Sequence, residues 1–359
     1  MKRVVGIIFC AFIVLTVLYS WIAFNRKGEV NGLEKRPLAV RPCRLADFPG
    51  WDAWLNDRFG GRDCYVGIAN FVKYRVLHAT IRQPVAFMGK NGWFYYTDPD
   101  DGDNLSDFNK TNLLDEQELD KYRTAVKGIR DWCDSNGIRC LFVITPNKHS
   151  VYPEHHLLRR PEGETRTGQL LSVLHSLDVP CVYPLDYLLL KKKTVKYPLY
   201  YETDTHWNGL GAWYGFEKIR EAVGQLFPEQ DFPEIACRVN VTYSDTLGDI
   251  LPLLGVKRAH STQISLTPSD GSWSDVYVYL KNNGMDGIVT QGKDSRLPKA
   301  VIFRDSFGTA LVPYLSILFS RAEYIWHRIT GEDKKRLLED KPDLIIIENA
   351  ERYAVFVDG

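Results

Sequence analysis

Short apolar segments alternate with helical segments through most of the chain, and this order constrains the fold more than any other feature. The segment 139–145 is an apolar run of strand length, and similar runs recur at 179–183, 299–304, 323–326 and 343–347. Strands that are apolar on both faces are typical of a parallel sheet buried between helices. The sequence therefore predicts a three-layer α/β fold, with a parallel sheet and helices on both of its faces.

The helices expected between these strands have one apolar face. The clearest lies at 115–134, where apolar side chains recur at three- and four-residue spacing and Asn136-Gly137 follows as a stop signal. Two more are expected, one near 166–177 and one at 208–227, which Asn208 is placed to cap.

Residues 37–359 are expected to form one large domain. With 45% hydrophobic and 13% aromatic residues, the chain can build a substantial core. The segments 37–110 and 238–296 do not follow the alternation. We expect both to cover one end of the sheet or to shape a cleft, with 238–296 as an insertion. The net charge is zero and the longest basic run is Lys191–Lys193, so nucleic acid is not an expected partner.

An uncharged apolar run occupies residues 4–24, behind Lys2 and Arg3. About 20 apolar residues suffice to span a bilayer as a helix. The run ends in bulky residues, without the small residues of a signal-peptide cleavage site. We therefore expect residues 1–24 to be an uncleaved membrane anchor and 25–36 a linker. The remaining domain would lie on the extracytoplasmic side, periplasmic or extracellular, of the cell membrane.

The cysteines are compatible with an exported domain. Outside the apolar run there are six, which permits three disulfides without fixing their pairing. None belongs to a Cys-x-x-Cys pair, which disfavours a zinc ribbon or a thioredoxin motif. Free buried thiols remain an alternative, above all for Cys140, which lies in an apolar segment expected to be a strand. The six are Cys43, Cys64, Cys133, Cys140, Cys181 and Cys237.

Two separate motifs carry the residue types of a serine nucleophile system. Asp204-Thr205-His206-Trp207 offers a carboxylate and an imidazole, and Asp305-Ser306-Phe307-Gly308 offers a hydroxyl at the end of an expected strand. A serine hydroxyl needs an imidazole to take its proton, and the imidazole needs a carboxylate on its other nitrogen. Each motif also has an ordinary explanation, since Asp-x-His occurs by chance and Asp-Ser can cap a helix.

The chain resembles the alginate O-acetyltransferase family of SGNH-hydrolase-like proteins. The resemblance rests on five collinear segments: Trp54–Asp63, Gly89–Tyr95, Val143–Lys148 with Val151–Pro153, Asp204–Trp207 and Asp305–Phe307. It implies an SGNH-hydrolase-like fold. It also implies Ser306 as nucleophile, His206 as base and Asp204 as the acid that orients the base. The order Asp, His, Ser differs from that of ordinary SGNH esterases but is shared by the alginate-type proteins.

Five further residues are candidates for an oxyanion or substrate site. Asn147 and Lys148 follow the strand 139–145, where Asn147 could aim an amide at an oxyanion and Lys148 could bind a uronate carboxylate. A simple turn is the alternative for both. Trp207 could stack on a sugar ring, although core packing explains it equally. Phe307 and Arg304 flank Ser306, and the sequence assigns no specific role to Arg304.

No cofactor and no metal site are expected. His149, His155 and His156 lack the i, i+4 spacing that two histidines on one helix face need to share a zinc ion.

Three functions remain open from the sequence. A transferase would pass an acetyl group from Ser306 to a polysaccharide hydroxyl, and the resemblance implies a multi-spanning membrane acyltransferase as the donor partner. An esterase would use the same three residues with water as acceptor, because the choice depends on water exclusion. A non-catalytic scaffold would only bind polysaccharide in a secretion complex. Alginate is one candidate polymer among several.

Overall fold

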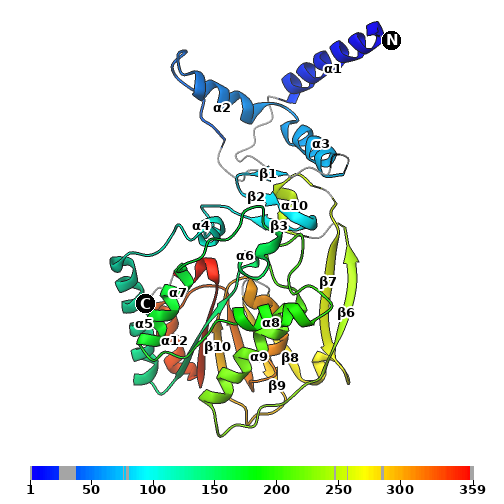
Figure 1. The fold of residues 1–359 in the computed structure, drawn as a ribbon. Coiled ribbons are helices and arrows are strands. Elements are labelled where there is room, and N and C mark those ends of the chain that lie inside the picture. The colour runs from blue at the N-terminus through cyan, green and yellow to red at the C-terminus, as the bar shows by residue number, and fades with distance from the viewer. Residues whose placement is uncertain are drawn as a thin grey trace.

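A computed structural model gives the structure of the protein, and it describes residues 2–23, 38–75, 77, 81–245, 248–256, 258–283 and 287–355. Within these ranges a central sheet lies between two layers of helices, as predicted (Figure 1).

The sheet has seven strands in the order β5-β4-β12-β10-β11-β9-β8. The first five are parallel: β5 (Cys181–Val182), β4 (Arg139–Thr145), β12 (Leu344–Ala350), β10 (Lys299–Phe303) and β11 (Arg321–Ile325). At the other edge β9 (Ile288–Gly292) pairs antiparallel with β11, and β8 (Tyr277–Asn282) pairs antiparallel with β9. The sheet is therefore mixed, and the prediction of a purely parallel sheet was wrong at this edge.

Helices cover both faces of the sheet (Figure 1). On one face α9 (Gly209–Leu226) packs against β4 and β5, beside α8 (Leu185–Thr194). On the other face α5 (Glu116–Ser135), α7 (Arg166–Ser176) and α12 (Gly331–Asp340) enclose a second core cluster. Alternate residues of β4 enter the two clusters, Leu141 the first and Phe142 the second. This two-sided burial explains the apolar strand runs.

Local sequence signals mark where these helices begin. Asp115 and Glu118 form a reciprocal capping box at the start of α5, and Thr330 and Asp333 form another at α12. The Asn208 side chain accepts hydrogen bonds from the N–H groups of Leu210 and Gly211 at the start of α9. The prediction that Asn208 caps this helix is confirmed.

Smaller elements surround the sheet. β1 (Arg82–Gln83), β2 (Ala86–Met88) and β3 (Phe94–Tyr96) form a separate antiparallel sheet, and β6 (Cys237–Ser244) pairs with β7 (Ser261–Pro268) in a long ribbon. The remaining helices are α2 (Phe48–Arg58), α3 (Arg62–Arg75), α4 (Asn104–Asn109), α6 (Lys148–Val151), α10 (Ile250–Leu253) and α11 (Val312–Leu315). The 238–296 region thus supplies both the ribbon and two strands of the main sheet.

The N-terminal apolar run forms α1 (Lys2–Ala23), which lies with α2 and α3 away from the sheet (Figure 1). In the part of the chain that the structure describes, no helix combines the length and the apolar character needed to cross a membrane. The predicted membrane anchor at 1–24 is therefore not confirmed. The predicted linker 25–36 lies outside the described residues.

Six cysteines, Cys10, Cys43, Cys133, Cys140, Cys181 and Cys237, are free thiols in the structure. Cys133 and Cys140 are buried at the end of α5 and the start of β4. This agrees with the free-thiol alternative for Cys140.

Candidate active site

Ser306 lies at the carboxyl edge of the sheet, in the turn that joins β10 to a short 3₁₀ helix, Phe307–Leu311. We call residues 304–308 the Ser306 turn. Asp305 holds this turn: its Oδ1 accepts the Phe307 N–H at 2.9 Å, and its Oδ2 accepts the Ala350 N–H at 2.6 Å. The turn is thereby tied to the end of β12, the neighbouring parallel strand.

Glu348 packs closely against Gly308 and also holds the Ser306 turn in place. The Glu348 carboxylate accepts the Asp305 N–H at 3.2 Å and the Thr145 hydroxyl at 3.0 Å. Burial and the nearby Asp305 charge raise the pKa of Glu348 well above its ordinary value. A Cβ at Gly308 would lie 2.6 Å from Glu348 Oε2 and 2.7 Å from the Arg304 Cβ. Only glycine fits this close approach.

Asp204 and His206 lie together in residues 201–207, which we call the His206 loop. Asp204 Oδ1 accepts the His206 backbone N–H at 3.0 Å and contacts His206 Nδ1 at 2.7 Å. The segment consists of bends and is not an extended strand, so a local turn brings the two side chains together. The structure therefore brings the carboxylate and the imidazole into direct contact.

The two segments meet at the serine. His206 Nε2 lies 2.7 Å from Ser306 Oγ, and the Trp207 indole N–H donates to the Phe307 carbonyl at 3.1 Å. A continuous chain of hydrogen bonds therefore runs from Asp204 through His206 to Ser306. Such a chain can remove the serine proton and hold the positive charge that then forms on the imidazole.

A second carboxylate, Asp249, supports the His206 loop. It accepts the Thr205 N–H at 2.8 Å and the Thr205 hydroxyl at 2.6 Å, and its own N–H donates to Asp204 Oδ2 at 3.1 Å. Burial opposes the ionisation of Asp204, yet hydrogen bonds from the His206 ring outweigh it and hold the pKa of Asp204 below its usual value. The surrounding protein and the Asp204 charge raise the pKa of Asp249, although 42% of its side-chain surface stays accessible.

Sequence reasoning missed Asp249, which lies more than forty positions beyond His206 outside any motif. Its neighbour Gly248 has a φ of 140°, and a Cβ there would lie 2.2 Å from the Thr203 carbonyl oxygen. This glycine allows the two backbones to approach closely enough for Asp249 to reach Thr205.

Lys148 also supports the His206 loop. It is 2% exposed, and its ammonium donates to the carbonyls of Tyr201, Glu202 and Asp204 at 3.1, 3.3 and 2.6 Å. Burial lowers the pKa of Lys148 to about 8. All three ammonium protons are thus directed at the loop, so this structure favours a supporting role for Lys148 over binding of a uronate.

Asn147 is fixed by two residues that follow β12. The Glu351 carboxylate accepts its backbone N–H at 2.9 Å, and Arg352 donates to its side-chain Oδ1 at 3.2 Å. Because the amide oxygen binds Arg352, the amide N–H₂ end of Asn147 is the part left for other partners. The Phe307 N–H is already bonded to Asp305.

The other three candidates are buried. Trp207 is 1% exposed and Phe307 is fully buried, so both pack in the core, which was the alternative for Trp207. Arg304 is 3% exposed, and its guanidinium donates to the Asp305 carbonyl and the Thr309 hydroxyl. Through these contacts the Arg304 side chain stabilises the Ser306 turn.

Comparison with known families identifies the type of domain. The family described as "SGNH hydrolase-like domain, acetyltransferase AlgX" matches residues 86–269, which is just over half of the 359 residues. The chain belongs to this family. The matched range includes Asp204, His206 and Asp249 and ends before Ser306, so the contact at the serine comes from the structure alone.

Curated and solved relatives agree with this assignment. A "Probable alginate O-acetylase AlgJ" of Pseudomonas syringae pv. tomato (strain ATCC BAA-871 / DC3000) is 24% identical over 174 residues, which cover 48% of this chain and 42% of that protein. The chain thus spans less than half the length of this curated relative.

Two solved structures share the fold. The O-acetyltransferase domain of Pseudomonas putida AlgJ has a TM-score of 0.51 at 16% identity and covers 77% of this chain and 94% of its own. Bacillus cereus PatB1 with a sulfonyl adduct has a TM-score of 0.54 at 15% identity and covers 76% of this chain and 98% of its own. The SGNH-like α/β fold predicted from the sequence is confirmed.

Asp204, His206 and Asp249 also have the spacing of a metal site, since one ligand atom of each lies within 4.8 Å of the others. A metal ion there would compete with the Asp204 hydrogen bond for His206 Nδ1. His149 and His156 do not belong to this group of possible ligands. They are buried among aromatic rings such as Phe108 and Tyr95.

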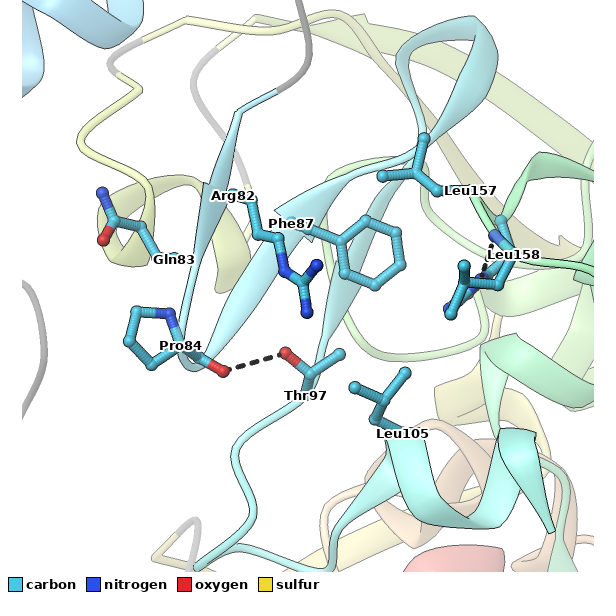
Figure 2. A pocket seen from close by; sticks show the side chains of 9 residues that line it. Arg82, Gln83, Pro84, Phe87, Thr97, Leu105, Leu157 and Leu158 are labelled. Carbon is cyan, nitrogen blue, oxygen red and sulfur yellow. Dashed lines mark hydrogen bonds between the residues drawn. The ribbon is translucent and has the colours of Figure 1, made fainter. Parts of the chain in front are cut away.

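A separate cavity of about 370 Å³ lies between the small sheet and the loop at 156–158 (Figure 2). The Arg82 guanidinium projects into it between Phe87 and Thr97. His156 also lines this cavity, and burial lowers the pKa of His156 to about 4. None of its lining residues belongs to the Ser306 turn or the His206 loop, so this cavity is distinct from the serine site.

Proposed function

We propose that this protein is an O-acetyltransferase that carries an acetyl group on Ser306 and passes it to a hydroxyl of an exported polysaccharide. The observation that carries the proposal is the contact of 2.7 Å between His206 Nε2 and Ser306 Oγ, with Asp204 bonded to the other ring nitrogen. Membership in the AlgX-type acetyltransferase family supports the acyl chemistry.

In the first half-reaction the Ser306 oxygen attacks the acetyl carbonyl while His206 takes the serine proton. Asp204 stabilises the imidazolium that results. The tetrahedral intermediate then releases the donor's alcohol, which receives the proton from His206, and the acetyl group remains on Ser306. In the second half-reaction His206 removes a proton from a sugar hydroxyl, whose oxygen attacks the acetyl carbonyl. The bond from the carbonyl carbon to the Ser306 oxygen then breaks, and His206 returns the proton to that oxygen.

Both half-reactions build negative charge on the acetyl oxygen, which needs hydrogen-bond donors. The Asn147 amide is our candidate donor, because Arg352 binds its oxygen and leaves the N–H₂ end for the site. The Phe307 N–H is a weaker candidate, since Asp305 already accepts it.

The acceptor polymer and the donor partner follow from the same proposal. The name of the Pseudomonas syringae relative points to alginate, and other exported polysaccharides remain candidates for this chain. We place the reaction on the extracytoplasmic side of the cell membrane, where such a polymer is accessible. A multi-spanning membrane acyltransferase would deliver the acetyl group there.

A transfer assay with the purified full chain tests the proposal. The chain is mixed with p-nitrophenyl acetate as donor and with oligosaccharide acceptors, and acetylated sugar and free acetate are both measured. We expect Ser306→Ala and His206→Ala each to reduce sugar acetylation by about a thousandfold or more, because the three residues act as a unit. Ser172→Ala, an exposed serine on α7, should retain full activity.

The products separate the alternatives. Acetylated sugar that depends on Ser306 supports the transferase, whereas acetate alone, with or without acceptor, supports a carbohydrate esterase. Polymer acetylation that survives Ser306→Ala supports a non-catalytic scaffold and contradicts the proposal.

A further inference from the structure

Trp326 lies directly after β11, at the same edge of the sheet as Ser306. The Arg304 N–H donates to the Ile325 carbonyl at 2.9 Å, so Trp326 is level with the Ser306 turn in the next strand. The Arg304 guanidinium lies 4.6 Å from the centre of the Trp326 ring. A residue of the Ser306 turn therefore covers part of an indole that remains half-buried at the surface.

A cavity of about 460 Å³ lies beside this indole. Residues at the ends of β8, β9 and β11 line it together with the first turns of α12. Crevices outside the carboxyl ends of parallel strands are where open α/β sheets bind their ligands. Its lining includes Glu323, Trp326, His327 and Arg336.

The charged lining residues balance in sign, with Lys281 and Arg336 against Glu323 and Asp333. Arg336 pairs with Glu323 at 2.8 Å and with Asp340 at 2.9 Å, and His327 Nδ1 lies 3.6 Å from the Asp333 carboxylate. The cavity therefore presents hydrogen-bond donors and acceptors without a large excess of either charge. An aromatic ring beside such groups suits a sugar, which has apolar C–H faces and a rim of hydroxyls.

The geometry points to an acceptor subsite in which a pyranose ring stacks on Trp326 while its hydroxyls bond to Glu323, His327 and Arg336. This inference rests on the proposed transfer through Ser306, and it identifies the part of the same sheet edge, on the side of α12, that holds the sugar chain. The subsite recognises hydroxyls, so its affinity for a neutral oligosaccharide depends little on salt.

Binding is tested without chemistry, on the full chain with Ser306→Ala. Calorimetry measures the Kd of cellohexaose and of a mannuronate hexamer at low and high salt. We expect Trp326→Ala to weaken binding about tenfold and Trp326→Phe to weaken it about threefold, since Phe keeps part of the stacking surface. Tyr243→Ala removes an aromatic ring that is 66% exposed on the β6–β7 ribbon, and it should leave the Kd unchanged.

Kinetics on the chain with Ser306 intact separate the subsite from the serine chemistry. Trp326→Ala should raise the KM for the sugar acceptor about tenfold and change acceptor-free hydrolysis of p-nitrophenyl acetate far less. Unchanged Kd and KM in Trp326→Ala overturn the subsite while leaving the proposed function intact. If neither sugar binds, or if the binding of cellohexaose is lost at high salt, the subsite is also overturned. Trp326-dependent binding by a chain without donor turnover would instead refute the proposed function alone.

Discussion

The Ser306 turn and the His206 loop reach the same contact but are held in different ways. The Ser306 turn is fixed to neighbouring strands of the sheet: Asp305 binds the Ala350 N–H at the end of β12, and Glu348, within β12, binds the Asp305 N–H. The His206 loop has no strand of its own. One buried ammonium, on Lys148, and one accessible carboxylate, on Asp249, bind its backbone, in addition to single N–H groups of Phe94 and Ile250.

This difference places the nucleophile on the rigid part of the fold and the base on a part that depends on charged side chains. Sites supported by strands hold their geometry more accurately than sites supported by loops. We therefore expect the His206 loop to be the more easily displaced of the two, while the Ser306 turn should be sensitive mainly to added volume.

Removal of the Lys148 ammonium should have the largest effect. Lys148→Met keeps the chain length but removes the donor to the Tyr201 and Asp204 carbonyls, whereas Glu202 keeps the Phe94 N–H. Each buried group that stays unpaired costs roughly 1–3 kcal/mol. We expect the free energy of unfolding to fall by about 3–5 kcal/mol. Acetyl transfer should also fall, and the exposed Lys193→Met serves as control. Chemical denaturation measures this, and wild-type stability with full activity would show that the loop does not depend on Lys148.

Added volume at Gly308 should have the next largest effect, this time on the Ser306 turn. The Cβ of Gly308→Ala would meet Glu348 and the Arg304 side chain and push the turn outward. A displacement of about 1 Å at a reacting group costs about a hundredfold in rate. Gly224→Ala on α9 meets no atom within 4 Å, so it should keep full activity and gain up to about 1 kcal/mol of stability. Equal rates of donor hydrolysis for the two variants would contradict a tightly packed Ser306 turn.

The pH dependence of stability should separate the two regions by sign. The raised pKa of Glu348 contributes stability that is complete below its unfolded pKa and is lost as pH rises toward its folded pKa. The lowered pKa of Asp204 acts oppositely, and its contribution is lost as pH falls toward that value.

Glu348→Gln isolates the first of these contributions. Relative to wild type, this variant should gain about 1.4 kcal/mol for each pH unit above about pH 5, within the window between the two pKa values. Unfolding by urea at pH 5 and pH 8 measures the change, with exposed Glu339→Gln as control. A difference between variant and wild type that does not change with pH would show that Glu348 is not shifted.

Removal of metal ions by a chelator should have no effect on the rate of acetyl transfer. If Asp204 serves His206 by a hydrogen bond, excess EDTA leaves the rate of acetyl transfer unchanged. Loss of activity with EDTA and its return with a divalent ion would instead assign Asp204, His206 and Asp249 to a metal centre.

The same comparison explains what the sequence could and could not predict. β4, β10 and β12 are buried on both faces, so their apolar runs stand out, and the edge that holds Ser306 follows from them. β8 and β9 join the sheet through antiparallel pairing, and β8 is largely exposed, so no apolar run marks it. The mixed edge of the sheet was missed for this reason.

Within the site, the motif residues were found because they are adjacent in sequence to each other or to a strand. The roles of Asp249, Arg352 and Lys148 come from contacts with segments that are distant in the sequence. No local sequence pattern encodes such contacts. Trp207 and Phe307 illustrate the opposite limit, since their residue types fit both sugar binding and core packing until their burial is known.

The central claim is that Ser306 receives the acetyl group through His206. The most direct test is mass spectrometry of the full chain, quenched shortly after addition of p-nitrophenyl acetate and then digested. The account predicts one acetyl group on the peptide that contains Ser306, strongly reduced in His206→Ala and discharged when oligosaccharide is added. An acetyl group on another residue, or transfer to sugar without any labelling of Ser306, would contradict it.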